Sequence, residues 1–123
     1  MDDDLAALTA RLEAFADERD WAQFHTPKNL VMALSGEVGE LTAEFQWLTA
    51  AQSAAVMTDQ DHADRVRAEI GDVMIYLTRL AGVLGIDLVA AANAKLTDSA
   101  RRYPPDRVRG DATKAAKGQP TES

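Results

Sequence analysis

The sequence contains no cysteine, which excludes disulfide bonds and metal sites built on thiolates. It also contains no apolar run approaching the roughly 18 residues that a membrane-spanning helix needs. The first residues, MDDDLAALTA, are acidic and lack the basic start and apolar stretch of a signal peptide. These absences lead us to expect a cytoplasmic protein that does not act at a membrane.

Basic residues are scarce compared with acidic ones. The 13 Lys and Arg residues against 20 Asp and Glu give a formal net charge of −7. A basic face is the usual footprint of proteins that bind the phosphate backbone, so we expect no nucleic-acid partner. An acidic protein can still bind an anionic small molecule if a divalent cation inverts the local charge.

Alternating strand patterns are absent as well, and the apolar periodicity predicts an all-α fold. The 123 residues suffice for one domain with a modest core. We assign the domain to residues 1–108 and expect a disordered polar tail over 109–123. Four helices are expected, over about residues 4–19, 27–49, 59–84 and 88–102. The alanine-rich segment before the third helix fits a loop or a short helix.

Capping residues set most of these helix boundaries. Thr26 before Pro27 is typical of an N-cap with proline at the first helical position. Thr58 is expected to cap the third helix, which Gly85 should end. Asp87 is the expected N-cap of the fourth helix.

The second and third predicted helices carry the same pattern 32 positions apart, as SGEVGEL over 35–41 and AEIGDV over 68–73. Apolar residues align with the same shift and follow the spacing of a core-facing stripe. They are Leu34, Val38, Leu41, Phe45 and Leu48 in the first copy, and Val66, Ile70, Val73, Leu77 and Leu80 in the second. We therefore expect the two helices to face one another or a shared core.

Each copy also carries two acids three residues apart, Glu37 with Glu40 and Glu69 with Asp72. On a helical wheel the first acid of each pair lies roughly 55° from the stripe centre and the second roughly 115°. Residues three apart are neighbours on a helix, so each pair can converge on one point. Four gathered carboxylates repel one another unless a cation is present, and carboxylate-only ligands suit Mg²⁺ or Mn²⁺. Solvated acids on exposed faces are the alternative that this pattern leaves open.

The two acid motifs, separated by 28 residues, resemble the signature of the all-α nucleoside triphosphate pyrophosphohydrolases, the superfamily of MazG and the dimeric dUTPases. The segments ERDWAQFHTPKNLVMALSGEVGELTAEFQW, EIGDVMIYLTRLA and RRYP are similar to the branch that includes dCTP pyrophosphatase. This resemblance covers about residues 12 to 104. It implies an oligomeric four-helix bundle that needs Mg²⁺, with Mn²⁺ as a substitute. It also implies cleavage between the α- and β-phosphates to a nucleoside monophosphate and pyrophosphate.

The resemblance also implies roles for individual residues. Glu37, Glu40, Glu69 and Asp72 would be metal ligands, and Glu37, at the edge of the stripe, is our choice of general base because partial burial should raise its pKa. The residues expected to contact the substrate are Trp21, His25, Trp47, Tyr76, Lys95 and Ser99. Ser99 departs from the family, which commonly has asparagine at that position. Core packing is the alternative for Trp47 and Tyr76, a turn cap for His25, and solvation for Lys95.

Three functional hypotheses follow. The first is an Mg²⁺-dependent nucleotide pyrophosphohydrolase that removes dCTP or a modified dCTP from the nucleotide pool. The second is a related hydrolase with another base preference, similar to the dUTPases. The third is a non-catalytic helical interaction module whose acids bind a basic partner, with no metal dependence. Under the first two we expect a homo-oligomer, a dimer or a tetramer, because so much apolar surface on four helices suggests a shared core.

Overall fold

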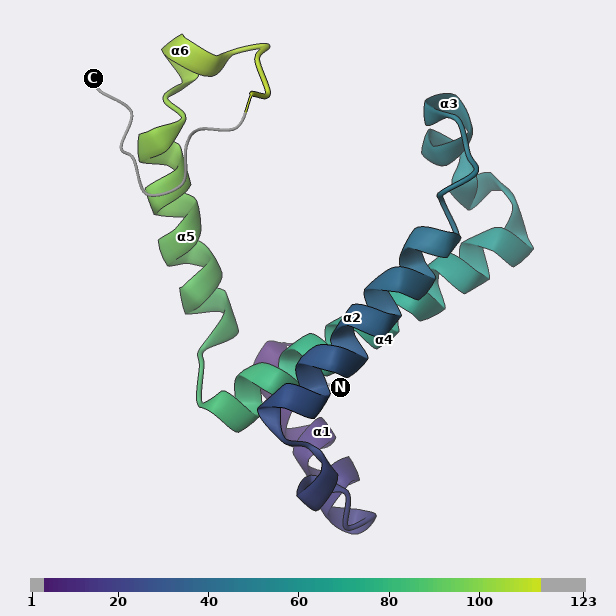
Figure 1. Ribbon diagram of the computed structural model, residues 1–123, viewed down its shortest axis with the longest axis vertical. Coiled ribbons are helices and arrows are strands. Elements are labelled where there is room, and N and C mark those ends of the chain that lie inside the picture. Colours follow the sequence, from purple (N-terminus) through teal and green to yellow (C-terminus); the bar gives the residue numbers. More distant parts are fainter. Residues whose placement is uncertain (1–3, 114–123) are drawn as a thin grey trace. The chain divides into compact units, whose positions relative to one another are not determined.

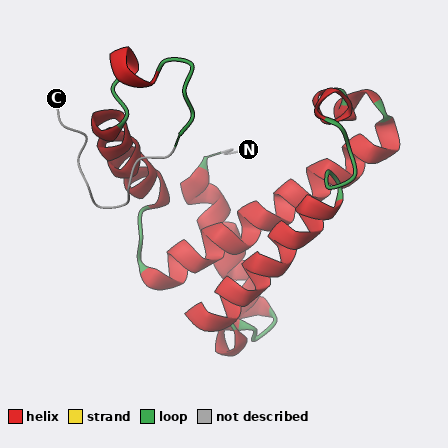
Figure 2. Cartoon of the chain, turned by 45° about the horizontal axis from the view of Figure 1, so that its top comes forward, coloured by secondary structure: helices red, strands yellow, loops and turns green. Residues whose placement is uncertain are grey.

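The structure is a computed structural model, and it describes residues 4–113 (Figure 1). Over these residues the regular structure is helical throughout, without a strand (Figure 2), which confirms the all-α prediction. The chain divides after Ile86 into two compact units. Most of the tail predicted over 109–123 lies outside the described residues, and the proposed domain boundary stays a prediction.

The first unit contains three long helices and three short ones. They are α1 (Leu5–Glu18), η1 (Ala22–Phe24), α2 (Pro27–Ala43), α3 (Ala50–Ala54), η2 (Val56–Thr58) and α4 (Gln60–Leu84). The second unit contains α5 (Leu88–Arg102) and the short α6 (Pro105–Val108). The four expected long helices are therefore present, while their assembly into a four-helix bundle stays a prediction.

Side-chain caps place most helix ends where the sequence predicts them. The Thr26 hydroxyl accepts from the backbone N–H of Asn29 at 3.2 Å, with Pro27 as the first residue of α2. Asp87 caps α5 through the N–H of Ala90 at 3.0 Å. Gly85 ends α4 with φ of 69°, in the left-handed region that glycine enters without strain.

Two boundary predictions are wrong. Helix α2 ends at Ala43 rather than near residue 49, and the chain continues through a turn at residues 44–47. Thr49 then forms a capping box with Gln52 that starts α3. The ambiguous segment is thus helical. The N-cap of α4 is Asp59 rather than Thr58. The Asp59 carboxylate accepts from the N–H groups at the helix start, whereas the Thr58 hydroxyl donates to the carbonyl of Ala55.

Helices α2 and α4 run side by side in opposite directions (Figures 1 and 2). Their contact agrees with the prediction from the aligned stripes that the two helices face one another. Helix α1 packs against α4, where the Cγ2 of Thr9 lies 3.5 Å from the position a Cβ on Gly82 would take. The buried apolar side chains of the described residues are few and mostly small. They are Ala16, Leu30, Val56, Ala63, Val66 and Ala81.

Two stripe residues depart from the expected burial: Val38 is 45% exposed and Ile70 53%. They occupy equivalent positions, each directly after an acid that faces the other helix. One residue turns the helix by about 100°, so both side chains point out of the seam between α2 and α4. Val31 and Met74 continue this exposed flank, at 50% and 40% exposed. Equivalent positions on two antiparallel helices lie on the same flank, so the pair presents one apolar surface.

In the second unit, Asp98 organises the C-terminal half of α5. Its carboxylate lies 2.6 Å from Arg101 Nη2 and 3.9 Å from both Lys95 Nζ and Arg102 Nη1.

Among residues 4–113, no single helix is both long and apolar enough to cross a membrane, and only the consecutive helices α4 and α5 taken together meet the criteria of length and composition.

Candidate metal centre

Three acids of the two repeated motifs meet in the seam between α2 and α4. Glu37, Glu40 and Glu69 each offer one carboxylate oxygen, and these oxygens all lie within 4.8 Å of one another. Glu37 and Glu40 are one turn apart on α2, and Glu69 faces them from the antiparallel α4. The convergence predicted from the three-residue spacing is therefore present for three of the four acids.

Asp72 belongs to the same cluster by its electrostatic effect. It is one turn beyond Glu69 on α4 and half-buried, and its negative charge acts on both Glu37 and Glu69. Burial, then the charges of Asp72 and Glu40, raise the pKa of the Glu37 carboxyl above its ordinary value. Burial, then the charge of Glu40, likewise raises the pKa of Glu69.

The cluster lacks compensating charge. Within residues 4–113, none of the four carboxylates forms an ion pair with a basic side chain. The Oε2 atoms of Glu37 and Glu69 are buried and have no hydrogen-bond partner in the described part of the chain. Buried carboxylate oxygens without a partner are costly, and a cation bound between them would offset that cost. The all-oxygen donor set fits a hard divalent cation.

The next carboxylate along the chain, at the C-cap of α2, has its charge compensated by neighbouring groups. Glu44 lies one turn beyond Glu40, and Arg65 Nε of α4 donates to its two oxygens at 2.9 and 3.2 Å. The Nε2 of His62 lies 2.8 Å from the Glu44 carbonyl oxygen and 3.7 Å from its carboxylate. This carboxylate is neutralised by protein groups and needs no metal.

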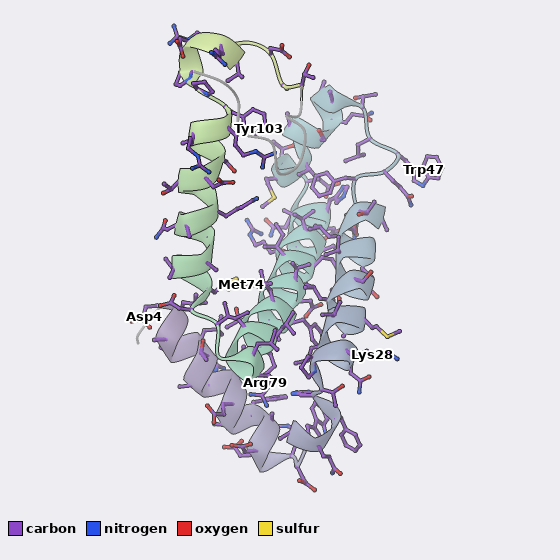
Figure 3. All side chains as sticks on the ribbon, turned by 60° about the vertical axis from the view of Figure 1, so that its left-hand side comes forward. Asp4, Lys28, Trp47, Met74, Arg79 and Tyr103 are labelled. Carbon is purple, nitrogen blue, oxygen red and sulfur yellow. The ribbon has the colours of Figure 1, made fainter. Side chains whose placement is uncertain are left out.

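The candidate substrate residues of the first unit lie at several places. Trp21 precedes η1, is 45% exposed, and packs edge-to-face on Phe15 with ring centroids 5.8 Å apart. Tyr76 is half-buried on α4, one turn beyond Asp72 and thus on the same face. Trp47 lies in the turn after α2, is 87% exposed and points away from the helices (Figure 3), which excludes core packing within this unit.

His25 directly follows η1, and its Nδ1 accepts a hydrogen bond from Arg79 Nε of α4 at 3.0 Å. Lys95 and Ser99 lie on α5, in the second unit, where Lys95 is 3.9 Å from Asp98. Their assignment to the substrate stays a prediction.

Three further residues near the cluster were not among the predicted site residues: Arg79, Arg65 and Glu44. The signal was present for the two arginines. Arg65 lies seven residues before Asp72 and Arg79 seven after it, and a seven-residue separation keeps side chains on one helical face. The acidic centre of α4 is thus flanked by a guanidinium at each end.

Comparisons with known proteins identify relatives of this chain in sequence and in fold. No protein-family model matches the sequence. The chain is 44% identical over 105 residues to dCTP pyrophosphatase 1 of Rattus norvegicus and 43% identical to that of Homo sapiens. These matches cover 85% of this chain but only 62% of each curated relative, so the chain spans less than two thirds of their length.

A solved structure gives an independent comparison of the fold. The crystal structure of a pyrophosphatase from Archaeoglobus fulgidus matches with a TM-score of 0.75 and 37% sequence identity. The match covers 80% of this chain and 91% of that one. The chain therefore belongs to the MazG-like, all-α nucleoside triphosphate pyrophosphatase family, together with the dCTP pyrophosphatases.

Proposed function

We propose that this protein is an Mg²⁺-dependent nucleoside triphosphate pyrophosphohydrolase. It cleaves between the α- and β-phosphates of dCTP or a modified dCTP and releases the nucleoside monophosphate and pyrophosphate. The observation that carries the proposal is the cluster of Glu37, Glu40 and Glu69, whose ligand oxygens lie within 4.8 Å of one another and include buried atoms without a partner among the described residues. The identity to dCTP pyrophosphatase 1 supports the choice of base.

The four acids would hold the cation, Glu37 and Glu40 from α2, and Glu69 and Asp72 from α4. When bound, Mg²⁺ neutralises the triphosphate and polarises the phosphorus under attack. Mn²⁺ accepts the same oxygen ligands and is the expected substitute. An acidic cluster without this charge inversion would repel a triphosphate.

Glu37 is the proposed general base. Burial raises the pKa of its carboxyl, and a base whose pKa approaches the working pH transfers protons more effectively than an ordinary glutamate. It would accept a proton from the water that attacks phosphorus, while the bond to the bridging oxygen breaks and pyrophosphate leaves.

The remaining candidates would bind the nucleotide. Trp21 and Trp47 both present exposed indole faces on which a base can stack, a contact worth about 1–3 kcal/mol in single-strand binders. Tyr76, on the face of α4 that carries Asp72, can donate to a sugar or phosphate oxygen. His25, Lys95 and Ser99 would supply further polar contacts.

We also propose that the protein works as a homo-oligomer. The exposed flank of Val31, Val38, Ile70 and Met74 is continuous along the α2–α4 pair, and a second copy would remove it from water. Both a dimer and a tetramer satisfy this requirement.

The testing experiment is turnover of a panel of nucleoside triphosphates with and without Mg²⁺, with pyrophosphate assayed separately from single phosphate. Wild type is compared with Glu40→Gln and Asp72→Asn. We expect Mg²⁺-dependent pyrophosphate release from dCTP that is lost in both variants. Preference for dUTP would favour the dUTPase-like alternative. No turnover of any nucleotide by a folded protein would favour the interaction module.

A further inference from the structure

A hydrogen bond joins the turn before α2 to the acidic face of α4. Arg79 Nε donates to Nδ1 of His25 at 3.0 Å, across 54 residues of sequence and in a partly buried position. The Arg79 side chain extends from α4 toward the segment between α1 and α2 (Figure 3).

The donor fixes the chemical state of the acceptor. A guanidinium carries only N–H donors and keeps its charge, so Nδ1 of His25 must be the nitrogen with the free lone pair. In a neutral imidazole the proton then sits on Nε2. Burial, then the positive charge of Arg79, lowers the pKa of His25, which favours this neutral form.

Other charged groups surround the pair. Glu13 and Asp17 of α1 line a pocket of about 290 Å³ together with Arg79 and Thr78 of α4. Neither acid is among the causes of the lowered pKa of His25, which are burial and the charge of Arg79. The contact at Nδ1, which depends on geometry, therefore determines the tautomer.

The bond also determines where the turn sits. Arg79 lies three residues after Tyr76 and seven after Asp72, on one face of α4. The other side of the turn is held by α2, where Asn29 Nδ2 donates to the Phe24 carbonyl at 3.0 Å. The segment that carries Trp21 and His25 is thus tied by side chains to both helices of the acid cluster.

We propose that Arg79 is a positioning residue for nucleotide binding. By donating to Nδ1 it holds His25 as the neutral tautomer with Nε2–H free to donate to an oxygen acceptor of the nucleotide, and it fixes the Trp21–His25 turn beside the α4 face. The nucleotide part of this inference rests on the proposed function. The tautomer of His25 and the hydrogen bond that holds the turn to α4 do not depend on the proposed function.

The first test needs no activity. The chain contains only two histidines, so long-range ¹H–¹⁵N spectra of the full-length, metal-free protein contain two imidazoles, and a His62→Gln variant assigns them. We expect His25 as the Nε2–H tautomer at neutral pH in wild type, and a tautomer mixture with a raised pKa in Arg79→Met. Arg65→Met is the matched control, because that guanidinium binds Glu44 instead, and it should leave the His25 signals unchanged. An Nδ1–H or mixed tautomer in wild type, or no change in Arg79→Met, would overturn the proposal.

The second test uses turnover. In Arg79→Met we expect KM for the preferred nucleotide to rise about tenfold while kcat stays within about threefold, because a binding contact is lost and the acids are intact. Arg79→Lys, which keeps the charge and can still donate, should recover part of the loss. An unchanged KM with altered spectra would show that the bond exists but does not position the nucleotide. Absence of turnover in wild type would contradict the proposed function, and the ¹H–¹⁵N spectra would still test the hydrogen bond between Arg79 and His25.

Discussion

Two carboxylates one turn apart at the C-terminal end of α2, Glu40 and the C-cap residue Glu44, differ in whether neighbouring groups compensate their charge. Glu44 accepts two hydrogen bonds from Arg65 and lies near His62, so the fold itself neutralises its charge. Glu40 faces Glu37 and Glu69, and within the described residues no basic group pairs with it. The same type of side chain on the same helix pair is thus compensated by a basic group in one place, whereas in the other it stands among like charges that a bound cation would offset. A partly buried carboxylate alone therefore does not indicate a metal site. The feature that distinguishes the cluster is that no basic side chain of the described residues compensates its negative charge.

The largest expected effect is that of replacing Glu40, and it tests the difference between Glu40 and Glu44 directly. We expect Glu40→Gln to lower kcat/KM for nucleotide hydrolysis by at least about 100-fold, because one ligand of the cation is removed. Glu44→Gln should stay within about threefold of wild type, because its partner Arg65 is 57% exposed and can be solvated. Initial rates of nucleotide hydrolysis at saturating Mg²⁺ give kcat/KM for both variants. Equal losses in the two variants would contradict the distinction.

Removal of the metal should affect the cluster that contains Glu40 and should not affect the surroundings of Glu44. A chelator is expected to abolish turnover, and excess Mg²⁺ to restore it. Mg²⁺ at about 100 times its Kd should stabilise the folded protein by about 2.7 kcal/mol, because it binds only the native cluster. Thermal unfolding monitored by circular dichroism should show this shift in wild type and Glu44→Gln but not in Glu40→Gln. A shift that persists in Glu40→Gln would place the ion elsewhere.

Without metal, neutralising the two kinds of acid should have opposite effects on stability. The pKa of Glu69 is raised in the folded protein, so its contribution to stability is present below its ordinary value of 4.5 and is lost as pH rises through the folded pKa. We therefore expect Glu69→Gln to stabilise the metal-free protein at neutral pH, and less so as the pH falls. Glu44→Gln should destabilise it by up to about 1 kcal/mol, through loss of the Arg65 contact. Urea unfolding in the presence of a chelator, between neutral pH and pH 4.5, measures the change in the free energy of unfolding for both variants.

The smallest effect concerns the glycine between the two α2 ligands. A Cβ at Gly39 would meet no atom within 4 Å. Gly39→Ala should therefore raise stability by up to about 1 kcal/mol through helix propensity alone, with little change in turnover. Destabilisation, or loss of activity at unchanged metal affinity, would indicate that another chain or the substrate approaches the helix there.

The helices and the acid cluster were predictable from the sequence because both depend on local spacing. Caps such as Thr26 and Asp87 act within one turn, and a three-residue interval brings acids together on any helix. The end of α2 at Ala43 was missed because no glycine or proline marks it, and the apolar spacing continues through Phe45 and Leu48. At the next boundary, two adjacent cap residues, Thr58 and Asp59, compete for the same helix start.

What the sequence could not provide was the pairing across elements. Nothing local to Glu44 distinguishes it from Glu40, and the difference arises only because Arg65 of the antiparallel α4 lies opposite. The contact between His25 and Arg79 depends on the same long-range register. Val38 and Ile70 fit the core stripe by period, yet they lie at its edge, where no other helix of the first unit covers them.

The most direct test of the account is calorimetric titration of the nucleotide-free protein with Mn²⁺ and Mg²⁺, in wild type, Glu40→Gln and Glu44→Gln. We predict that wild type and Glu44→Gln bind the ion with similar affinity. Glu40→Gln should bind at least about tenfold more weakly, since removal of a carboxylate ligand lowers both the charge and the ligand count. Unaltered binding in Glu40→Gln, or an equal loss in Glu44→Gln, would contradict the claim that the uncompensated cluster between α2 and α4 is the metal site.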